Sequence, residues 1–566
     1  MRKFPHDHAL APLRTDSSRW RSSCAPIAIL LAACTGTIGN NAGGGSGSPS
    51  TGTGGQPGEF VPQTSSLRRL TIPQYTNAIH DLLGPSIQVT TQFDDDIRFG
   101  GFVTIGVANV GVSAKMTEQF ESTAYDVARQ ALTDTARRGA LLGCAPASVA
   151  DETCTRSFVE KFGRRAWRRP LSQDEIARYS AVAKNAQKVL NDFYGGLQYA
   201  LAGLLQSPHF VYREEVGTVP DATNLARVSF SDSELATRLS FLLWNSTPDD
   251  ALLAAADAHQ LTQGGLVAEA RRLLASERII AGVESFFSEL YWLSDLDQLA
   301  LNPMIYPQMS ATLGESMRTE TLQFLKNIVL VRNADVREIF DSRATFVNTE
   351  LAKIYDLAPV AASAGFVNVT LPDSGMRAGF MGQGSFLAMP SHSQPNRSSP
   401  TLRGKFVREI LLCQSVSPPP PVVPAFPDAI MGTAREKLEF HRSVPSCAAC
   451  HAFMDPIGLG FENFDGVGAQ RTTEFGKTID ASGDLDGVKF SGPRELMTAI
   501  RNHPDAVACI ARNAYRYAVA HVDNDGERGV VGDVAKEFQD TGLHFRSLLE
   551  AVVKSPGFKY AAKPVN

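Results

Sequence analysis

The sequence lacks several features that would assign it to a common class of protein. Its formal net charge is −5 and its pI is near 6.2, so nothing in the composition indicates a surface for polyanions, and no RNA- or DNA-binding motif is present. The apolar run at residues 25–33 is far too short to span a bilayer. Segments that alternate apolar and polar residues are scarce, which argues against a protein made of sheets. These absences leave a globular, mainly helical chain.

Cysteine is sparse, and only one of its pairs has the Cys-x-x-Cys spacing. This pair is Cys447 and Cys450, and His451 follows it directly. Two thiols three residues apart can form thioethers with the two vinyl groups of one porphyrin, and the next imidazole can then bind the iron. The pattern therefore predicts one covalent c-type haem, with Cys447 and Cys450 as attachment points and His451 as an axial ligand.

A zinc site and a redox pair are the alternatives for this motif. A structural zinc site usually needs four ligands, and the chain has no second Cys-x-x-Cys. A thioredoxin-like pair would lie in a βαβ unit, whereas Pro445 precedes this motif and the sequence Asp-Pro-Ile-Gly follows at residues 455–458. Covalent haem is the favoured interpretation.

The ligand on the opposite face of the iron would decide the chemistry, since a second strong ligand favours electron transfer and an open face favours small-ligand or peroxide chemistry. Met454 leaves the same side of the porphyrin as His451. His441 is the better candidate, because the segment from it to the motif could span up to about 20 Å when extended. Met389 and His392, in a loop rich in Gly and Pro, are the competitors. An ordinary surface or core role is the alternative for each of them.

The N-terminal region has the pattern of an export signal. Arg14, Arg19 and Arg21 precede the apolar run. The run ends in Leu-Ala-Ala-Cys at residues 31–34, a sequence that resembles a bacterial lipobox. The expectation is a lipoprotein signal peptide over 1–34, with Cys34 lipidated, and a flexible Gly/Ser/Pro tether over 35–65. Such a protein would be exported and held by its lipid at the outer or periplasmic membrane face, where c-type haem is attached. The alternative is that these residues form an N-terminal tail whose apolar run is accidental and is not an export signal.

Four cysteines remain once Cys24 is removed with the signal peptide, Cys34 is lipidated and Cys447 and Cys450 bind haem, and this even number suits an oxidising compartment. Cys144 and Cys154 are ten residues apart, so a local disulfide is the natural pairing. Cys413 and Cys509 would then join the regions before and after the haem motif. The sequence alone permits three pairings, and free buried thiols are a further alternative.

Helical periodicity and capping signals divide the rest of the chain. Thr71 is a predicted N-cap, and Ser172 with Glu175 and Ser231 with Glu234 form predicted capping boxes. The last helices are expected near residues 506–519 and 532–553. The fold class is therefore mainly α, with several helical modules in tandem and a cytochrome-c-like haem-binding segment near the C-terminus. The expected modules are an N-terminal one at 66–138, one with a Cys pair at 139–216, a large one at 226–358, the haem-motif module at 370–472 and a C-terminal one at 473–566.

Several blocks of the sequence resemble a family of multi-module, exported, cytochrome-like proteins of the planctomycete type, made of domains of unknown function. The most specific block runs from His441 through the haem motif to Asp455-Pro456 and on to Arg471. The chain departs from the family at residues 517–521, where Tyr-Ala-Val-Ala-His replaces Tyr-Ala-Leu-Gly-Arg. The resemblance covers residues 67–558 and includes the blocks 68–71, 81–84, 164–171, 238–244 and 399–405.

The resemblance implies a cytochrome-like protein but no defined activity, so three functions compete. The favoured one is a cytochrome that passes single electrons to a redox protein partner of unknown identity, because no separate catalytic constellation accompanies the haem motif. The others are a peroxidase- or oxygenase-like haem enzyme with an open iron site, and a non-redox surface scaffold or glycan-binding lipoprotein. Whether the chain is an enzyme is left open. Glu462, Asp465 and Arg471 would fix the loop after the haem or pair with its propionates, or form a purely structural ion pair.

Overall fold

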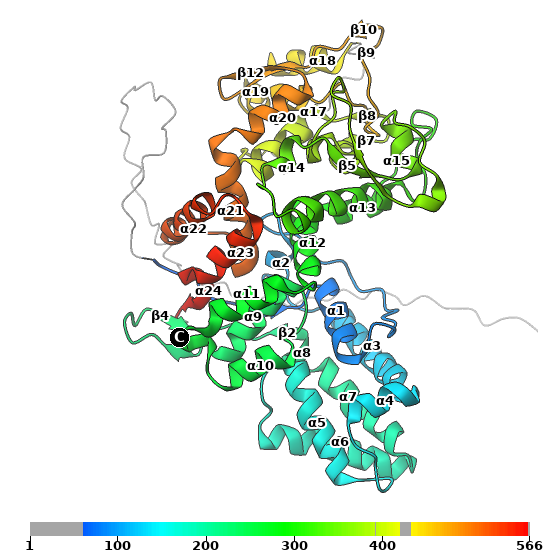
Figure 1. Cartoon of the computed structure of the whole chain (residues 1–566), viewed down its shortest axis with the longest axis vertical. Coiled ribbons are helices and arrows are strands. Elements are labelled where there is room, and N and C mark those ends of the chain that lie inside the picture. Colours follow the sequence, from blue (N-terminus) through cyan, green and yellow to red (C-terminus); the bar gives the residue numbers. More distant parts are fainter. Residues whose placement is uncertain (1–59, 391, 419–431, 564–566) are drawn as a thin grey trace, which may run out of the picture. The chain divides into compact units, whose positions relative to one another are not determined.

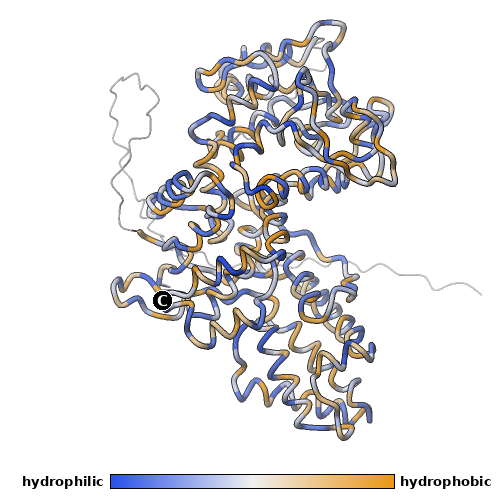
Figure 2. The backbone as a smooth tube through the Cα atoms, viewed as in Figure 1, coloured by the Kyte–Doolittle hydropathy of each residue, from blue (hydrophilic) through white to orange (hydrophobic). Residues whose placement is uncertain are grey.

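The computed structural model of the chain describes residues 60–390, 392–418 and 432–563. The predicted signal peptide, Cys34 and most of the predicted tether lie outside these residues. The described part is mainly helical, with short antiparallel strand pairs, and it confirms the predicted fold class of tandem helical modules (Figure 1). Orange apolar and blue polar residues interleave along the helices (Figure 2). No helix within the described residues is both long and apolar enough to cross a membrane.

The first part of the chain forms helices around its own core. Thr71 and Ser172 both make capping boxes, as predicted, and Cys144 forms a disulfide with Cys154. The strand β1 (Arg68–Arg69) pairs antiparallel with β2 (Tyr212–Arg213) and so joins the two ends of this part. Its helices are α1 (Ile72–Leu83), α3 (Ala114–Thr133), α4 (Thr135–Leu142), α5 (Glu152–Trp167), α6 (Gln173–Leu190), α7 (Phe193–Gln206) and α8 (Pro208–Val211). The short helix α2 (Val103–Gly106) lies in the same stretch of sequence, but its Ile105 packs in the larger core.

The middle part contributes most of the second, larger core. Ser231 makes its predicted capping box with Glu234 and starts a helix that is buried on nearly every side. The elements of this part are β3 (Val219–Pro220), β4 (Arg227–Ser229), α9 (Asp232–Trp244), α10 (Asp250–Asp257), η1 (Leu261–Gly265), α11 (Leu266–Ala275), α12 (Ile279–Leu290), η2 (Leu293–Gln298), α13 (Leu313–Lys326), η3 (Asn327–Val331), α14 (Glu338–Asp341), β5 (Ala344–Val347), α15 (Thr349–Ile354), η4 (Ala362–Ala364) and β6 (Val367–Thr370).

The part that carries the haem motif is built on a close crossing of two helices, α17 (Pro400–Phe406) and α19 (Pro445–Leu459). A Cβ atom at Gly404 would lie 2.0 Å from the carbonyl oxygen of Met454, and one at Gly458 would lie 1.7 Å from that of Pro400. Only glycine permits this approach. The remaining elements here are η5 (Phe380–Gly382), α16 (Gly384–Leu387), β7 (Ser393–Gln394), β8 (Arg397–Ser398), η6 (Val407–Leu411), α18 (Ala434–Arg442), β9 (Thr473–Glu474) and β10 (Lys477–Thr478).

The C-terminal part packs back on the earlier modules. Its last strand, β13 (Tyr560–Ala562), pairs with β4 in the three-stranded sheet β13-β4-β3. The single helix expected near 532–553 is broken at Gly542 and Leu543, which both have positive φ. The other elements are β11 (Ser482–Leu485), β12 (Val488–Ser491), α20 (Pro493–Arg501), α21 (Pro504–Val519), η7 (Asp525–Glu527), α22 (Arg528–Asp540), α23 (Phe545–Lys554) and α24 (Pro556–Lys559).

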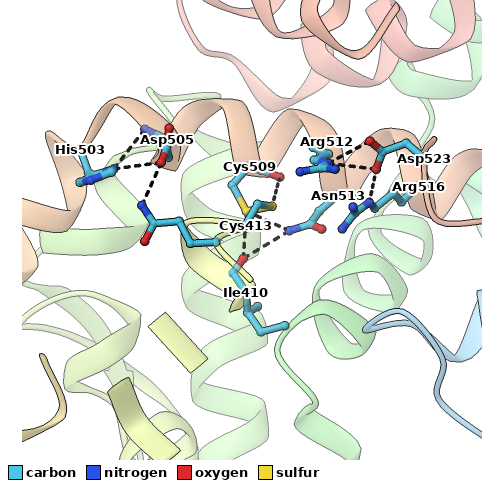
Figure 3. The surroundings of a disulfide bond; sticks show 10 residues. Ile410, Cys413, His503, Asp505, Cys509, Arg512, Asn513, Arg516 and Asp523 are labelled. Atoms are coloured by element: carbon cyan, nitrogen blue, oxygen red, sulfur yellow. Dashed lines mark hydrogen bonds and ion pairs between the residues drawn. A yellow bond between two sulfur atoms is a disulfide. The ribbon is translucent and has the colours of Figure 1, made fainter. Parts of the chain in front are cut away.

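A second disulfide joins Cys413, just after η6, to Cys509 on α21 (Figure 3). The side-chain amide of Asn513 donates to the carbonyl of Ile410 at 3.3 Å and so closes the same contact. Both disulfides are the pairs that the spacing of the cysteines favoured. The haem-motif part is therefore covalently tied to the C-terminal helices.

Candidate haem-binding site

The haem motif lies on α19, which begins at Pro445. Cys447 and Cys450 are half-buried free thiols, whereas the other four cysteines within the described residues form disulfides. His451 is also half-buried and occupies the next position of the same helix. The structure thus keeps the two thiols unpaired beside the imidazole, as attachment of a porphyrin requires.

His451 is held by a buried carboxylate one helical turn further along. Its Nδ1 atom lies 3.1 Å from both carboxylate oxygens of Asp455, which is fully buried. Thr401 on α17 donates to the same carboxylate at 2.8 Å. Burial raises the pKa of Asp455, and its interactions with His451 and Thr401 act against that rise. Because a carboxylate only accepts hydrogen bonds, Nδ1 is the donor, and in the neutral imidazole Nε2 then keeps its lone pair.

A cavity of about 900 Å³ adjoins the imidazole of His451. Its wall combines apolar side chains with three cationic side chains, two carboxylates and two histidines. Arg397 and Lys437 form no ion pair with a carboxylate within the described residues, and Lys437 instead lies 5.1 Å from the ring centre of Phe475. The lining residues are Ile305, Tyr306, Gln394, Asn396, Arg397, Ser398, Ser399, Pro400, Thr401, Ala434, Lys437, Leu438, His441, His451, Asp465, Arg471, Thr473, Glu474 and Phe475.

His441, the favoured candidate for the distal ligand, is brought directly to His451. It lies in the last turn of α18, and the two ring centres are 4.4 Å apart at an interplanar angle of 71°. Burial, followed by the charge of His451, lowers the pKa of His441. Two imidazoles on opposite sides of one metal ion need ring centres about 6 Å apart. A distal role for His441 therefore requires α18 to move away from α19, and this role stays a prediction.

Met389 and His392 are not brought to the cavity. Met389 is fully buried in the larger core. His392 is buried as well, donates from Nδ1 to the carbonyl of Phe386 at 2.7 Å and packs edge-on against Phe386 and Phe406. Burial lowers the pKa of His392 to about 3, so it is a neutral core residue. The distal role of Met389 stays a prediction that its place in the fold does not favour.

A buried ion-pair network supports one wall of the cavity. Arg403 is fully buried, and its side chain pairs with Glu462 at 3.2 Å and donates to four backbone carbonyls. Glu462 also accepts from Arg471 at 2.7 Å and from Ser398 at 2.9 Å. Asp465 accepts from the backbone N–H groups of the loop that follows it. Of the three roles expected for Glu462, Asp465 and Arg471, the contacts show the fixing of this loop and a structural ion pair, and pairing with propionates stays a prediction.

Sequence reasoning missed the partners of His451. Asp455 is four residues after His451 on a helix, so both face the same side, and this spacing was visible in the sequence. Thr401 gave no signal, because its contact depends on the crossing of α17 and α19. Within the described residues, His, Cys, Asp and Glu side chains form no group of three or more that could hold a metal ion by itself. The free thiols and the oriented imidazole on one helix, with the cavity beside His451, fit a haem, which would bring further nitrogen ligands for the iron. Cys447 and Cys450 themselves are not among the residues that line the cavity.

Five family models match the chain in tandem. They are described as Protein of unknown function (DUF1587) over residues 68–133, (DUF1595) over 154–215, (DUF1592) over 230–357, (DUF1588) over 377–474 and (DUF1585) over 486–558. The model over 377–474, which covers the haem motif, has the short name PSCyt3. No curated protein and no solved structure matches the chain. The chain therefore belongs to the multi-module, planctomycete cytochrome-type family of unknown function that these five domains define.

Proposed function

We propose that this protein is an exported, lipid-anchored c-type cytochrome that transfers single electrons. Cys447 and Cys450 would hold one haem through thioethers, and His451 would be an axial ligand. The observation that carries the proposal is the state of His451, whose Nδ1 is bound to Asp455 while its ring lines a large cavity. Cys447 and Cys450 are free thiols on the same helix, although neither is among the residues that line the cavity. The haem would supply one-electron redox chemistry.

The cavity wall supports this proposal through its charges. The haem carries two propionates, and Arg397, Lys437 and Arg471 offer cationic partners at the wall. Arg471 is already positioned by Glu462, so it needs little reorganisation to accept a carboxylate. The apolar side chains of the wall, among them Leu438 and Pro400, would exclude water from the porphyrin face.

The proposed location rests on the N-terminal pattern and on the disulfides. The Leu-Ala-Ala-Cys sequence would place a lipid on Cys34, and the tether would separate the folded part from the membrane. The two disulfides suit an oxidising compartment. The redox partner would be another exported redox protein that reaches the same membrane face.

Expression of the full chain together with a cytochrome-maturation system tests the proposal. The mature protein is expected to give a pyridine haemochrome spectrum of c type and a mass that exceeds the lipidated polypeptide by one haem. Cys447→Ala with Cys450→Ala should abolish both signals, while Cys34→Ala should keep the haem and release the protein from the membrane fraction. A colourless wild-type protein, with the mass of polypeptide and lipid alone, would leave only an anchored scaffold.

A haem enzyme with an open iron site is the second candidate function. The size of the cavity and the location of Met389 and His392 away from it favour this candidate. Optical spectra of the ferric and ferrous protein separate the two. A six-coordinate, low-spin iron that does not bind carbon monoxide supports electron transfer, and a high-spin iron that binds carbon monoxide supports the enzyme.

A further inference from the structure

We propose that Asp455 is a positioning residue: it holds His451 in the Nδ1–H tautomer, with the Nε2 lone pair available to a metal ion, and it lowers the reduction potential of the iron that His451 would bind. The second half of this statement rests on the proposed function. The first half concerns the protein alone and can be tested without haem.

The geometry gives the Asp455 carboxylate two side-chain donors, the imidazole of His451 and the hydroxyl of Thr401. Both of its oxygens lie 3.1 Å from Nδ1 of His451, and the described residues offer it no ion pair with Arg or Lys. Asp455 has no exposed surface, whereas the side chain of His451 is 21% exposed. Water therefore cannot replace the imidazole as the donor to this carboxylate, and the hydrogen bond is charge-assisted.

The carboxylate is fixed from a second helix. Thr401 on α17 donates to Oδ1 of Asp455, and the glycine crossing of α17 and α19 sets the distance between these helices. The carboxylate therefore cannot rotate away from the imidazole without losing the Thr401 hydrogen bond. Thr401 also lines the cavity that His451 adjoins.

A carboxylate bound to Nδ1 changes the ring nitrogen on the other side. It fixes the tautomer and the orientation of the ring, and it makes the free nitrogen a stronger base. A more basic axial ligand and a nearby negative charge stabilise the ferric state over the ferrous state. Asp455 would thus set both the direction in which His451 presents Nε2 and the electron affinity of the bound iron.

The tautomer is measured in the haem-free Cys447→Ala, Cys450→Ala protein, labelled with ¹⁵N-histidine, at pH 8. The His451 signals are assigned from a His451→Gln spectrum. We expect Nδ1–H to dominate, and Asp455→Asn to lower the ratio of Nδ1–H to Nε2–H by roughly tenfold, the contribution of a hydrogen bond to a charged group. An unchanged ratio would overturn the assignment. Thr401→Val, which leaves the charge in place, should lower the ratio less, and it decides the question if Asp455→Asn does not fold.

The potential is measured by spectroelectrochemistry on the haem-loaded full chain. Asp455→Asn should shift the ferric–ferrous equilibrium at least tenfold toward the ferrous form, which is about 59 mV for a one-electron couple. Asp484→Asn is the matched control, because it removes the same charge from a 44% exposed side chain on β11. A shift for Asp455→Asn no larger than that of the control rejects the electronic role. Wild-type protein without haem refutes the proposed function instead, and the tautomer measurement still decides the role of Asp455.

Discussion

At the scale of single residues, Arg403 shows how the cavity wall is stabilised. Its guanidinium satisfies one carboxylate and the carbonyls of Leu387, Phe461, Phe464 and Asp465, all in the interior. A buried charge of this kind is strongly destabilising when its partners are left behind.

Arg403→Leu is expected to destabilise the folded state by about 3–5 kcal/mol, since Glu462 keeps only Arg471 as a cationic partner and four carbonyls lose a donor. Thermal unfolding followed by circular dichroism measures the change in midpoint. Arg332→Leu is the control, because its ion pair with Glu338 is about two-fifths exposed on the Arg side and should contribute less than about 1 kcal/mol. Equal midpoints for the two variants would contradict the role of Arg403.

Glu289 on α12 gives a pH-dependent prediction. Its side chain is partly exposed at the surface but mostly surrounded by protein, and burial raises its pKa to about 7 even though Thr104 donates two hydrogen bonds to it. The folded state therefore binds a proton that the unfolded state has released between about pH 4.5 and pH 7, and stability falls as pH rises through this window.

Wild type should lose up to about 3 kcal/mol of unfolding free energy as the pH rises through this window. Glu289→Gln cannot ionise and should not show this loss, so its stability relative to wild type should increase between pH 5 and pH 8. Thermal midpoints across that range provide the measurement. Glu269→Gln on α11, whose carboxylate pairs with Arg272, should keep the wild-type dependence. If the thermal midpoints of wild type and Glu289→Gln change with pH in the same way, Glu289 does not have the raised pKa.

Local side-chain chemistry was predictable at this scale, and contacts between distant residues were not. The caps at Thr71, Ser172 and Ser231 follow from residues three positions apart, and the structure contains all three. His392 looked like a possible ligand in a loop, yet it is a neutral core residue because Phe386 and Phe406 surround it. Its burial depends on packing between segments that periodicity cannot place.

At the scale of elements, the crossing of α17 and α19 positions the site. The Cys-x-x-Cys-His motif could be recognised in the sequence, but neither it nor helix periodicity indicated that Gly404 and Gly458 lie at a contact between two helices. The close approach lets Thr401 reach Asp455, so a shift of either helix would disturb the orientation of His451.

Gly404→Ala is expected to destabilise the fold by about 1–3 kcal/mol, because its Cβ atom would overlap the carbonyl of Met454 and force the helices apart. Gly532→Ala on α22 is the matched control, since a Cβ atom there meets nothing within 4 Å. That control should stabilise the protein by about 0.4–1 kcal/mol, because alanine loses less backbone entropy in a helix. Relative to wild type, the thermal midpoint should fall for Gly404→Ala and rise for Gly532→Ala. Shifts in the same direction would contradict the close packing at Gly404.

At the scale of the whole described unit, the modules are joined by contacts that run against the order of the chain. Glu215 is buried among Arg68, Arg213 and Arg238, and Arg238 also donates to the carbonyl of Phe558 at 3.0 Å. These residues come from four of the five matched domains. The family resemblance could be predicted from the sequence, but this shared junction could not, because it depends on residues hundreds of positions apart.

The two disulfides should differ in their contribution to stability. Cys413–Cys509 closes a loop over a sequence separation of 96, and Cys144–Cys154 closes one over a separation of 10. The chain-entropy relation gives about 5 kcal/mol for the long loop and about 3 kcal/mol for the short one. Replacing the first pair by alanine should therefore lower the thermal midpoint more than replacing the second. A larger loss from the Cys144/Cys154 variant would show that local strain or residual structure outweighs loop length.

The pairing of β13 with β4 has a consequence for the order of assembly. During synthesis β4 emerges long before β13, so the edge of β4 and the Arg238 side chain gain their C-terminal partners only when the end of the polypeptide is made. Helix α19 precedes β13 in the chain, so Cys447 and Cys450 emerge while this sheet is still open. If the proposed function holds, this order would give haem attachment a period in which to occur before the final strand closes the fold.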